Sequence, residues 1–310
     1  MPKRLLMKSL QVIDIVYKNA PDSQKIWVEA TNRYWLEGGL KSFKKSLENH
    51  VELSKSLADS ILNNLPKKPK VVVDIGAGYG GVAVNLALKG FNVTAVEPVK
   101  KERDVIAYFL RRFPKAKKNL KIIEGAAENL PIKSNSVDLC VLSQVLEHVE
   151  DSDKTMCEII RVLKPGGYCH ISSPNYLFPA EQHYHLPYFP LMSKKLFSKW
   201  AIFVLKTMNI RGIKEVKNRD FSLVEEFIDS LNYTTDKLIR SLCSKNNLEI
   251  VWSFNDQAGL LTQIKQHYLQ NPSLKGVALV SLSMPIKIIR TALIYSGMLP
   301  IKLEYIIQKS

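Results

Sequence analysis

Short apolar runs alternate with amphipathic segments along the middle of the chain. Three segments carry apolar residues at helical spacing: Val82–Lys89, Lys100–Phe113 and Asp153–Leu163. Five short runs between and around them are typical of buried parallel strands: Lys70–Ile75, Asn92–Val96, Lys121–Glu124, Val137–Ser143 and Tyr168–Ser173. This alternation of strand and helix predicts an α/β fold built on a doubly wound, mostly parallel sheet.

The flanking sequence follows other patterns. Before the strands, Leu57, Ile61, Leu62 and Leu65 recur at helical spacing, so we expect residues 1–66 to form an N-terminal helical cap on a core of residues 67–175. Residues 176–255 are expected to add a loop, helices near 194–209 and 222–246 and a late strand at Leu248–Phe254 to the same domain. The last segment, 256–310, is basic and apolar; for it we expect a helical addition and a strand near Val277–Ser283.

Charge and composition narrow the class of protein. The 310 residues are 46% hydrophobic and 24% charged, which is ordinary for a globular chain and excludes a disordered or low-complexity one. The net charge of +15 divides into +5 for residues 1–68, +3 for 69–175 and +7 for 176–310. The excess positive charge therefore lies mostly outside the strand-rich middle and favours an anionic acceptor or surface.

The cysteines and the N-terminus bear on the compartment. Cys140, Cys157, Cys169 and Cys243 lack the spacing of zinc ligands, and Cys140 and Cys169 lie in apolar runs typical of buried reduced thiols. The N-terminal residues have no clean apolar core and no small-residue cleavage site, so we expect no signal peptide. These features predict a cytoplasmic protein.

A glycine-rich turn follows the first predicted strand. The sequence there is Asp74-Ile75-Gly76-Ala77-Gly78-Tyr79-Gly80-Gly81, and it leads into a helix N-terminus, which favours negative groups. Glu97 follows the second predicted strand, where a carboxylate can accept hydrogen bonds from two ribose hydroxyls. Asp74 lies beside the turn and suits a cationic ligand better than a pyrophosphate.

These motifs resemble those of class I S-adenosylmethionine-dependent methyltransferases, in the type 11 group, which have a Rossmann-like sheet. Further matching segments are Gly125–Pro131, Ser136–Asp138 followed by Val141–Val149, and Arg161–Gly167. Ala126 replaces an Asp that the family often has, and Asp138 is expected to orient its strand. The resemblance implies that S-adenosylmethionine is the cofactor. It implies that the cofactor-binding residues are Asp74, Gly76, Ala77, Gly78, Tyr79, Glu97, Pro98, Ala126, Ala127 and Ser143.

Histidines are the candidates for catalysis at the acceptor. Methylation of a hydroxyl needs a base near neutral pH, and His148, His183 and His185 follow the fourth and fifth predicted strands. Each of them could equally serve only to fix a loop. The segment Gln144–His148 is similar to the E-x-x-E-H motif of ubiquinone-biosynthesis O-methyltransferases, which holds a divalent ion. Gln144 replaces the first Glu and is a poorer ligand for a hard cation. A divalent ion held by Glu147, His148 and His183 or His185 is therefore left open as an alternative but is not expected.

The predicted reaction is O-methylation of a small-molecule or lipid-linked acceptor, quinone-like or from a glycan pathway. An RNA methyltransferase is the alternative that the charge suggests, although no RNA-binding module is recognisable and no nucleic-acid partner is expected. A non-catalytic nucleotide-binding protein or an NAD-dependent dehydrogenase is the alternative of another class, since Gly76–Gly81 also satisfies G-x-G-x-x-G. Residues 274–307 could make a peripheral membrane contact, or form an ordinary helix packed on the sheet.

Overall fold

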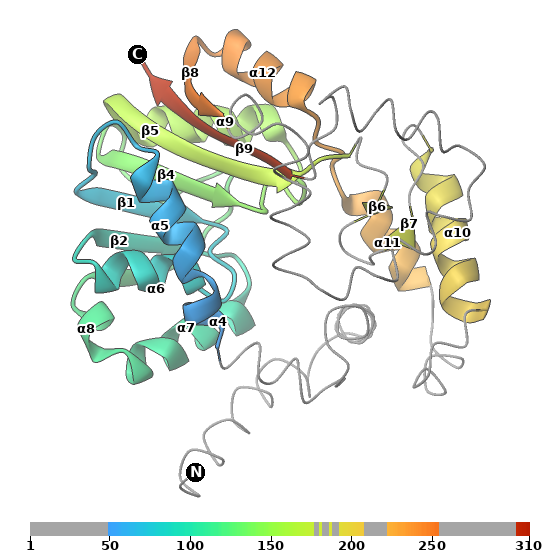
Figure 1. Ribbon diagram of the computed structural model, residues 1–310, viewed down its shortest axis with the longest axis horizontal. Coiled ribbons are helices and arrows are strands. Elements are labelled where there is room, and N and C mark those ends of the chain that lie inside the picture. The colour runs from blue at the N-terminus through green and yellow to red at the C-terminus, as the bar shows by residue number, and fades with distance from the viewer. Residues whose placement is uncertain (1–48, 177–179, 182–185, 188–191, 208–221, 254–301) are drawn as a thin grey trace, which may run out of the picture.

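The computed structural model describes residues 49–176, 180–181, 186–187, 192–207, 222–253 and 302–310. Seven strands form one sheet in the order β3-β2-β1-β4-β5-β9-β8 (Figure 1). Their bounds are β1 Val71–Ile75, β2 Asn92–Val96, β3 Leu120–Ile123, β4 Val137–Ser143, β5 Leu163–Pro174, β8 Leu248–Ser253 and β9 Lys302–Lys309. The strands from β3 to β5 pair in parallel, and β9 runs antiparallel to both β5 and β8. The predicted mostly parallel, Rossmann-like sheet is confirmed.

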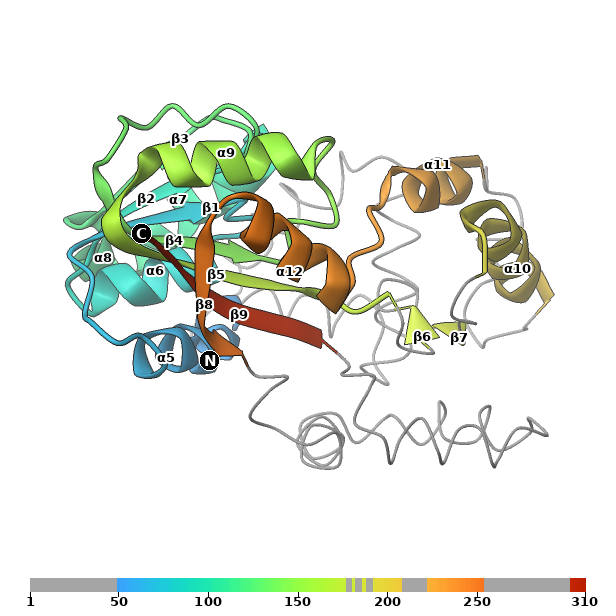
Figure 2. The same cartoon turned by 90° about the horizontal axis from the view of Figure 1, so that it is seen from above.

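Helices cover both faces of this sheet (Figure 2). One face packs against α4 (His50–Leu53), α5 (Lys55–Asn63), α6 (Gly81–Leu88), α7 (Lys100–Arg112) and α8 (Pro114–Lys117). The other packs against α9 (Ser152–Val162) and α12 (Asp236–Lys245). Two buried apolar clusters result, one on each side, as expected when strands alternate their side chains between two covered faces.

The described part of the N-terminal cap packs against α6 and forms a hydrogen bond with it. Ile61 is buried in the first cluster, where Leu57, Leu62 and Leu65 pack against it, as their spacing predicts. The buried Asn85 side chain donates to the carbonyl oxygen of Val51 at 2.6 Å. The helical cap therefore closes the side of the sheet next to the glycine turn, since α6 begins directly after that turn.

The C-terminal strand β9 is a finding that the sequence pattern did not predict. A helical addition was expected there, but residues 302–309 form a strand between β5 and β8. Leu303, Tyr305, Ile306 and Ile307 are fully buried. Residues 303–307 are thus part of the buried sheet rather than of a surface helix. Residues 274–301, which include the strand expected near Val277–Ser283 and most of the predicted membrane-contact segment 274–307, lie outside the described residues.

The segment after β5 contains two short strands, β6 (Ala180–Glu181) and β7 (Leu186–Pro187), and two helices, α10 (Lys194–Thr207) and α11 (Ser222–Ser230). Figures 1 and 2 both place these elements beyond the carboxyl end of β5. The single helix predicted over 222–246 is in fact two, α11 and α12. Thr235 separates them because its side chain accepts the N–H of Leu238 and caps the start of α12.

Cys140, Cys169 and Cys243 are buried free thiols and Cys157 is an exposed one, which agrees with the prediction for Cys140 and Cys169. Among the helices of the described residues, none has the length and apolar character needed to cross a bilayer.

Candidate cofactor and acceptor site

The glycine turn packs closely against the segment that follows β4. Gly76, Gly78 and Gly80 have φ values of +62°, +53° and +75°, a region that favours glycine. A Cβ on Gly76 would lie 2.7 Å from a methyl carbon of Val145, so the close approach also requires glycine. The turn therefore presents its backbone at the carboxyl edge of the sheet, where open parallel sheets bind ligands.

Glu97 joins this turn to the end of β2. Its side chain is 3% exposed, and its two carboxylate oxygens accept the N–H groups of Gly78 at 2.9 Å and Val99 at 2.8 Å. The N–H of Ala77 donates to the carbonyl oxygen of Val96 at 3.1 Å. The structure thus brings Ala77, Gly78 and Glu97 together, while Pro98 lies exposed beside them.

Asp74 is buried at the end of β1, with 3% of its surface exposed. One of its oxygens, Oδ2, has no hydrogen-bond partner among the described residues. Burial raises the pKa of Asp74 to about 7, against the effect of the hydrogen bond from the Ala83 backbone, and the nearby charge of Glu97 raises it further. A buried carboxyl oxygen without a partner is expected to meet a ligand group that donates a hydrogen bond.

Glu102 is a member of this site that the sequence reasoning missed. It lies in the first turn of α7, and its Oε2 would be 3.7 Å from a Cβ placed on Gly78. Burial, the charge of Glu97 and a hydrogen bond to the Glu97 side chain raise the pKa of Glu102 to about 7. Its position in the first turn of the helix that follows Glu97 could have suggested it.

The loop after β3 forms the next part of the site. Ala127 is buried, and Ala126 pairs with Asn129 in an isolated bridge. Glu128 accepts the N–H of Glu150 at 2.7 Å. One carboxylate oxygen of Glu128 therefore links this loop to the segment before α9. The predicted adenine contact, through backbone groups at Ala126 and Ala127 and the side chain of Glu128, stays a prediction.

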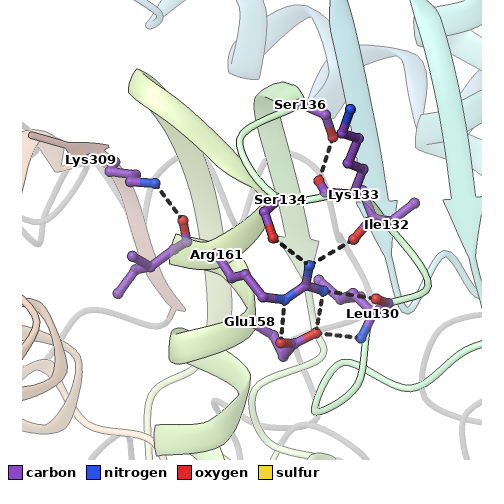
Figure 3. A network of polar contacts seen from close by, with 9 residues as sticks. Leu130, Ile132, Lys133, Ser134, Ser136, Glu158, Arg161 and Lys309 are labelled. Atoms are coloured by element: carbon purple, nitrogen blue, oxygen red, sulfur yellow. Dashed lines mark hydrogen bonds and ion pairs between the residues drawn. The ribbon is translucent and has the colours of Figure 1, made fainter.

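Arg161 fixes the rest of that loop (Figure 3). Its guanidinium donates to the carbonyl oxygens of Leu130 and Ile132 at 2.9 and 2.8 Å. It also donates to the Ser134 hydroxyl and, with two nitrogens at 2.7 Å each, to Glu158. Glu158 in turn accepts the N–H of Leu130 at 2.7 Å. Five hydrogen bonds use the full donor capacity of the guanidinium, so α9 holds the loop in one position.

The ends of β4 and β5 make the opposite side of the site. The hydroxyl groups of Ser143 and Ser172 lie 3.2 Å apart. Gln144 follows with a φ of +58°, and its N–H donates to the carbonyl oxygen of Ser172 at 2.8 Å. Ser143 thus reaches the same edge as the glycine turn, because β4 is the neighbour of β1 in the sheet.

Glu147 is 2% exposed and links three segments. Its carboxylate accepts a hydrogen bond of 2.9 Å from the Ser173 hydroxyl. The Ser173 hydroxyl oxygen in turn lies 2.7 Å from the Thr234 hydroxyl oxygen. Its backbone carbonyl accepts the N–H of Asn232 at 2.6 Å. Groups of three or more His, Cys, Asp or Glu side chains suited to a metal ion do not occur within the described part of the chain.

His148 lies in the turn after β4 and is exposed. Its ring lies 6.2 Å from that of Phe227 on α11, measured between centroids. It therefore faces the region between the sheet edge and the segment that contains α11. His183 and His185 lie outside the described residues.

Comparison with known proteins decides the family of the core. The family model described as methyltransferase domain matches residues 73–171. The chain contains a class I methyltransferase domain. The match runs from β1 to β5 and includes the glycine turn, Glu97 and Arg161, so the predicted class I methyltransferase family is confirmed. The domain contains every cofactor-binding residue that the resemblance predicted.

Curated relatives are similar over the same core. An uncharacterized methyltransferase of Mycobacterium sp. (strain JLS) is 32% identical over 114 residues, covering 37% of this chain and 42% of the relative. An uncharacterized methyltransferase of Mycobacterium tuberculosis (strain ATCC 25618 / H37Rv) is 36% identical over 103 residues, covering 33% of this chain and 39% of the relative. The chain thus spans about two fifths of the length of these relatives.

A geranyl diphosphate C-methyltransferase of Streptomyces coelicolor A3(2) is a similar solved structure. Its TM-score is 0.49 and its sequence identity is 15%, over 84% of this chain and 77% of that protein.

Proposed function

We propose that the chain is an S-adenosylmethionine-dependent methyltransferase that methylates an oxygen of a small-molecule or lipid-linked acceptor. The observation that carries the proposal is the Glu97 carboxylate held on the Gly78 and Val99 N–H groups at the mouth of the glycine turn. Such a carboxylate is fixed in place to accept the two hydroxyls of a ribose. S-adenosylmethionine supplies an electrophilic methyl group on a sulfonium centre when it is bound.

The residues present fit that cofactor. Glu97 would hold the ribose, and Ala126 and Ala127 would border the adenine. The Asp74 Oδ2 atom, buried without a partner among the described residues, suits the ammonium group of the amino-acid tail. Gly76 and Gly78 leave room for the ligand at this turn because neither residue has a side chain.

On the acceptor side, His148 is the candidate general base. It is exposed at the carboxyl edge, and its ring borders α11 through Phe227. The role proposed for its imidazole is to take the proton of the acceptor hydroxyl as the methyl group is transferred. His183 and His185 are the further candidates from the loop after β5.

A lipid-linked acceptor is supported by the surface of α10. Leu196 and Phe203 are 56% and 58% exposed on this helix, and Lys195 and Lys199 are exposed beside them. Apolar and basic residues on one helix face favour contact with an anionic membrane surface. The helix lies beyond the carboxyl end of β5, on the side where the acceptor would enter (Figure 1).

Calorimetry on the full chain tests the proposal against its alternatives. S-adenosylmethionine is expected to bind, NAD is not, and Glu97→Gln should weaken binding roughly tenfold or more because an amide cannot accept both N–H groups. Glu124→Gln, an exposed carboxyl whose partner is Arg103, is the control. Binding of NAD without S-adenosylmethionine would overturn the proposal in favour of a dehydrogenase.

The acceptor class needs a separate assay. S-adenosylhomocysteine release is measured with quinol, glycan and RNA fractions as methyl acceptors, with magnesium and with a chelator. We expect turnover with a quinol or glycan fraction, loss of turnover in His148→Asn with unchanged cofactor binding, and no effect of the chelator. Turnover only with RNA would refute the small-molecule assignment. Turnover that depends on magnesium would support a metal-assisted reaction instead.

A further inference from the structure

Asn232, in the linker between α11 and α12, forms hydrogen bonds with both chain neighbours of His148. Its backbone N–H donates to the carbonyl oxygen of Glu147 at 2.6 Å. Its side-chain amide donates to the carbonyl oxygen of Val149, across a separation of 83 residues. One residue from a distant part of the chain therefore holds the backbone on either side of His148.

The turn that contains His148 is neither helix nor strand over residues 144–150. Within this turn, the N–H of His148 donates to the carbonyl oxygen of Val145 at 2.8 Å. A functional side chain on a loop is placed less precisely than one on a helix or strand, unless neighbouring groups fix the loop. The two hydrogen bonds from Asn232 fix it in this way.

The linker that carries Asn232 is attached to the end of β5 by Thr234, which is 1% exposed. The Thr234 hydroxyl donates to the carbonyl oxygen of Pro174 at 2.5 Å, and the Thr234 carbonyl oxygen accepts the N–H of Tyr176 at 2.9 Å. Asn232 lies two residues before this buried anchor. The sheet, and not α11 alone, therefore determines where the two donors of Asn232 lie.

The ring of His148 faces the same part of the chain. It lies 6.2 Å from the ring of Phe227 on α11, measured between centroids, and α11 ends two residues before Asn232. The His148 side chain is exposed, so a second molecule can reach it. Helix α11 and the linker after it thus lie against the ring of His148 and hold the backbone of its two neighbours.

We propose that Asn232 is a positioning residue for His148. The inference rests on the proposed function, in which a ring nitrogen of His148 takes the proton of the acceptor hydroxyl. A displacement of about 1 Å in such a group can lower a rate about a hundredfold. Asn232 acts through the backbone on either side of His148 and takes no proton itself.

NMR relaxation of the full chain tests the positioning without any acceptor. The order parameter of the His148 N–H should be about 0.85 in the wild type and should fall toward about 0.6 in Asn232→Ala. This variant keeps the backbone bond to Glu147 and loses the side-chain bond to Val149. Asn232→Asp, which has the same size but no side-chain donor, is the second variant in case the first does not fold.

Asn246→Ala is the matched control. The side chain of Asn246 also donates to a backbone carbonyl oxygen, that of Leu242 at 2.8 Å, but it does so at the end of α12. Its removal should leave both the order parameter of His148 and the turnover unchanged.

Release of S-adenosylhomocysteine with the quinol and glycan fractions measures the effect on the reaction. Asn232→Ala should lower kcat roughly ten- to a hundredfold and leave the KM for S-adenosylmethionine unchanged. In a His148→Asn background, the same substitution should lower the residual turnover by less than about twofold, because no base is left to position. A role in stability alone would lower turnover by the same factor in both backgrounds.

Two results would overturn the proposal: an order parameter of His148 that both Asn232 variants leave unchanged, or an equal loss of turnover in the two backgrounds. Absence of turnover by the wild type with every fraction would instead refute the proposed function. The order parameter would then still decide whether Asn232 holds His148 in place, so the two failures are distinguishable.

Discussion

The backbone N–H of Gly78 donates a hydrogen bond of 2.9 Å to Glu97 Oε2, across a separation of 19 residues. This bond connects the turn after β1 to the end of β2, and the parallel register of Asp74 with Ala95 and Ile75 with Val96 makes it possible. The same carboxylate also holds the start of α7 through Val99. One buried side chain therefore shapes the site and is positioned to bind the ligand.

Gly76→Ala should abolish cofactor binding and destabilise the fold. Its φ of +62° is unfavourable for Ala, and the new Cβ would lie 2.7 Å from Val145. Gly90→Ala is a matched control, because Gly90 has a φ of +91° but nothing within 4 Å of the added Cβ. We expect both to lose about 1 kcal/mol of unfolding free energy through backbone strain, and Gly76→Ala to lose more through the clash. Equal losses in chemical denaturation would show that the contact with Val145 is not restrictive.

Arg161→Lys should loosen the loop beside the candidate adenine site. A lysine has three donors at one point and cannot make the five hydrogen bonds seen for the guanidinium. The Arg161 side chain is 36% exposed, so we expect a loss of only about 1–3 kcal/mol in unfolding free energy. Hydrogen exchange of residues 126–134 should accelerate in Arg161→Lys and stay unchanged in Arg111→Lys, an exposed arginine of α7. Unchanged exchange in both variants would contradict the anchoring role.

Glu304→Gln should reduce stability at neutral pH and have less effect in acid. Burial alone would raise the pKa of Glu304, but the hydrogen bond to His170 at 3.0 Å and the charge of Lys302 outweigh it and lower that pKa to about 2. A lowered pKa stabilises the fold above the unfolded value of about 4.5, and this contribution disappears as the pH falls toward about 2.

The stability difference between wild type and Glu304→Gln should therefore shrink as the pH falls, by at most roughly 3 kcal/mol over the whole range. Urea unfolding at about pH 5, 4 and 3 measures it. Glu249→Gln, an exposed carboxyl on β8, should show no such trend. A difference that is constant with pH would contradict the ionised state of Glu304.

The double variant Leu196→Ser/Phe203→Ser should bind anionic vesicles roughly tenfold more weakly than the wild type, because two exposed apolar side chains of α10 are removed. Vesicles of about 70% phosphatidylcholine and 30% phosphatidylglycerol are suitable for co-sedimentation. Leu53→Ser is the control, since Leu53 is 61% exposed on α4. Equal binding by all three proteins would exclude a membrane role for α10.

The sheet and the cofactor side of the site were predictable from the sequence because their signals are local. Strands β1 to β4 are short apolar runs, and the glycine turn and Glu97 follow two of them directly. Asp138 was expected to orient its strand, and its carboxylate does accept the N–H groups of Lys70 and Val71.

Other features depend on contacts between distant residues. Strand β9 begins and ends with Lys, and its partners on β5 are more than a hundred residues away, so its pattern resembled a basic apolar tail. Strand β5 begins at Leu163 rather than Tyr168 because Leu163 already pairs with Val137 of β4. Residues 164–167 form a β-bulge between this pair and the next one, Leu139 with Tyr168. Glu102 was missed because only the fold places it against Glu97.

The position of the bound cofactor is the central claim, and a crystal structure with S-adenosylhomocysteine tests it most directly. We predict that both ribose hydroxyls lie within hydrogen-bond distance of the Glu97 carboxylate, with the amino-acid tail at Asp74 and Gly76. A ligand bound elsewhere, or a ribose that does not contact Glu97, would contradict the account.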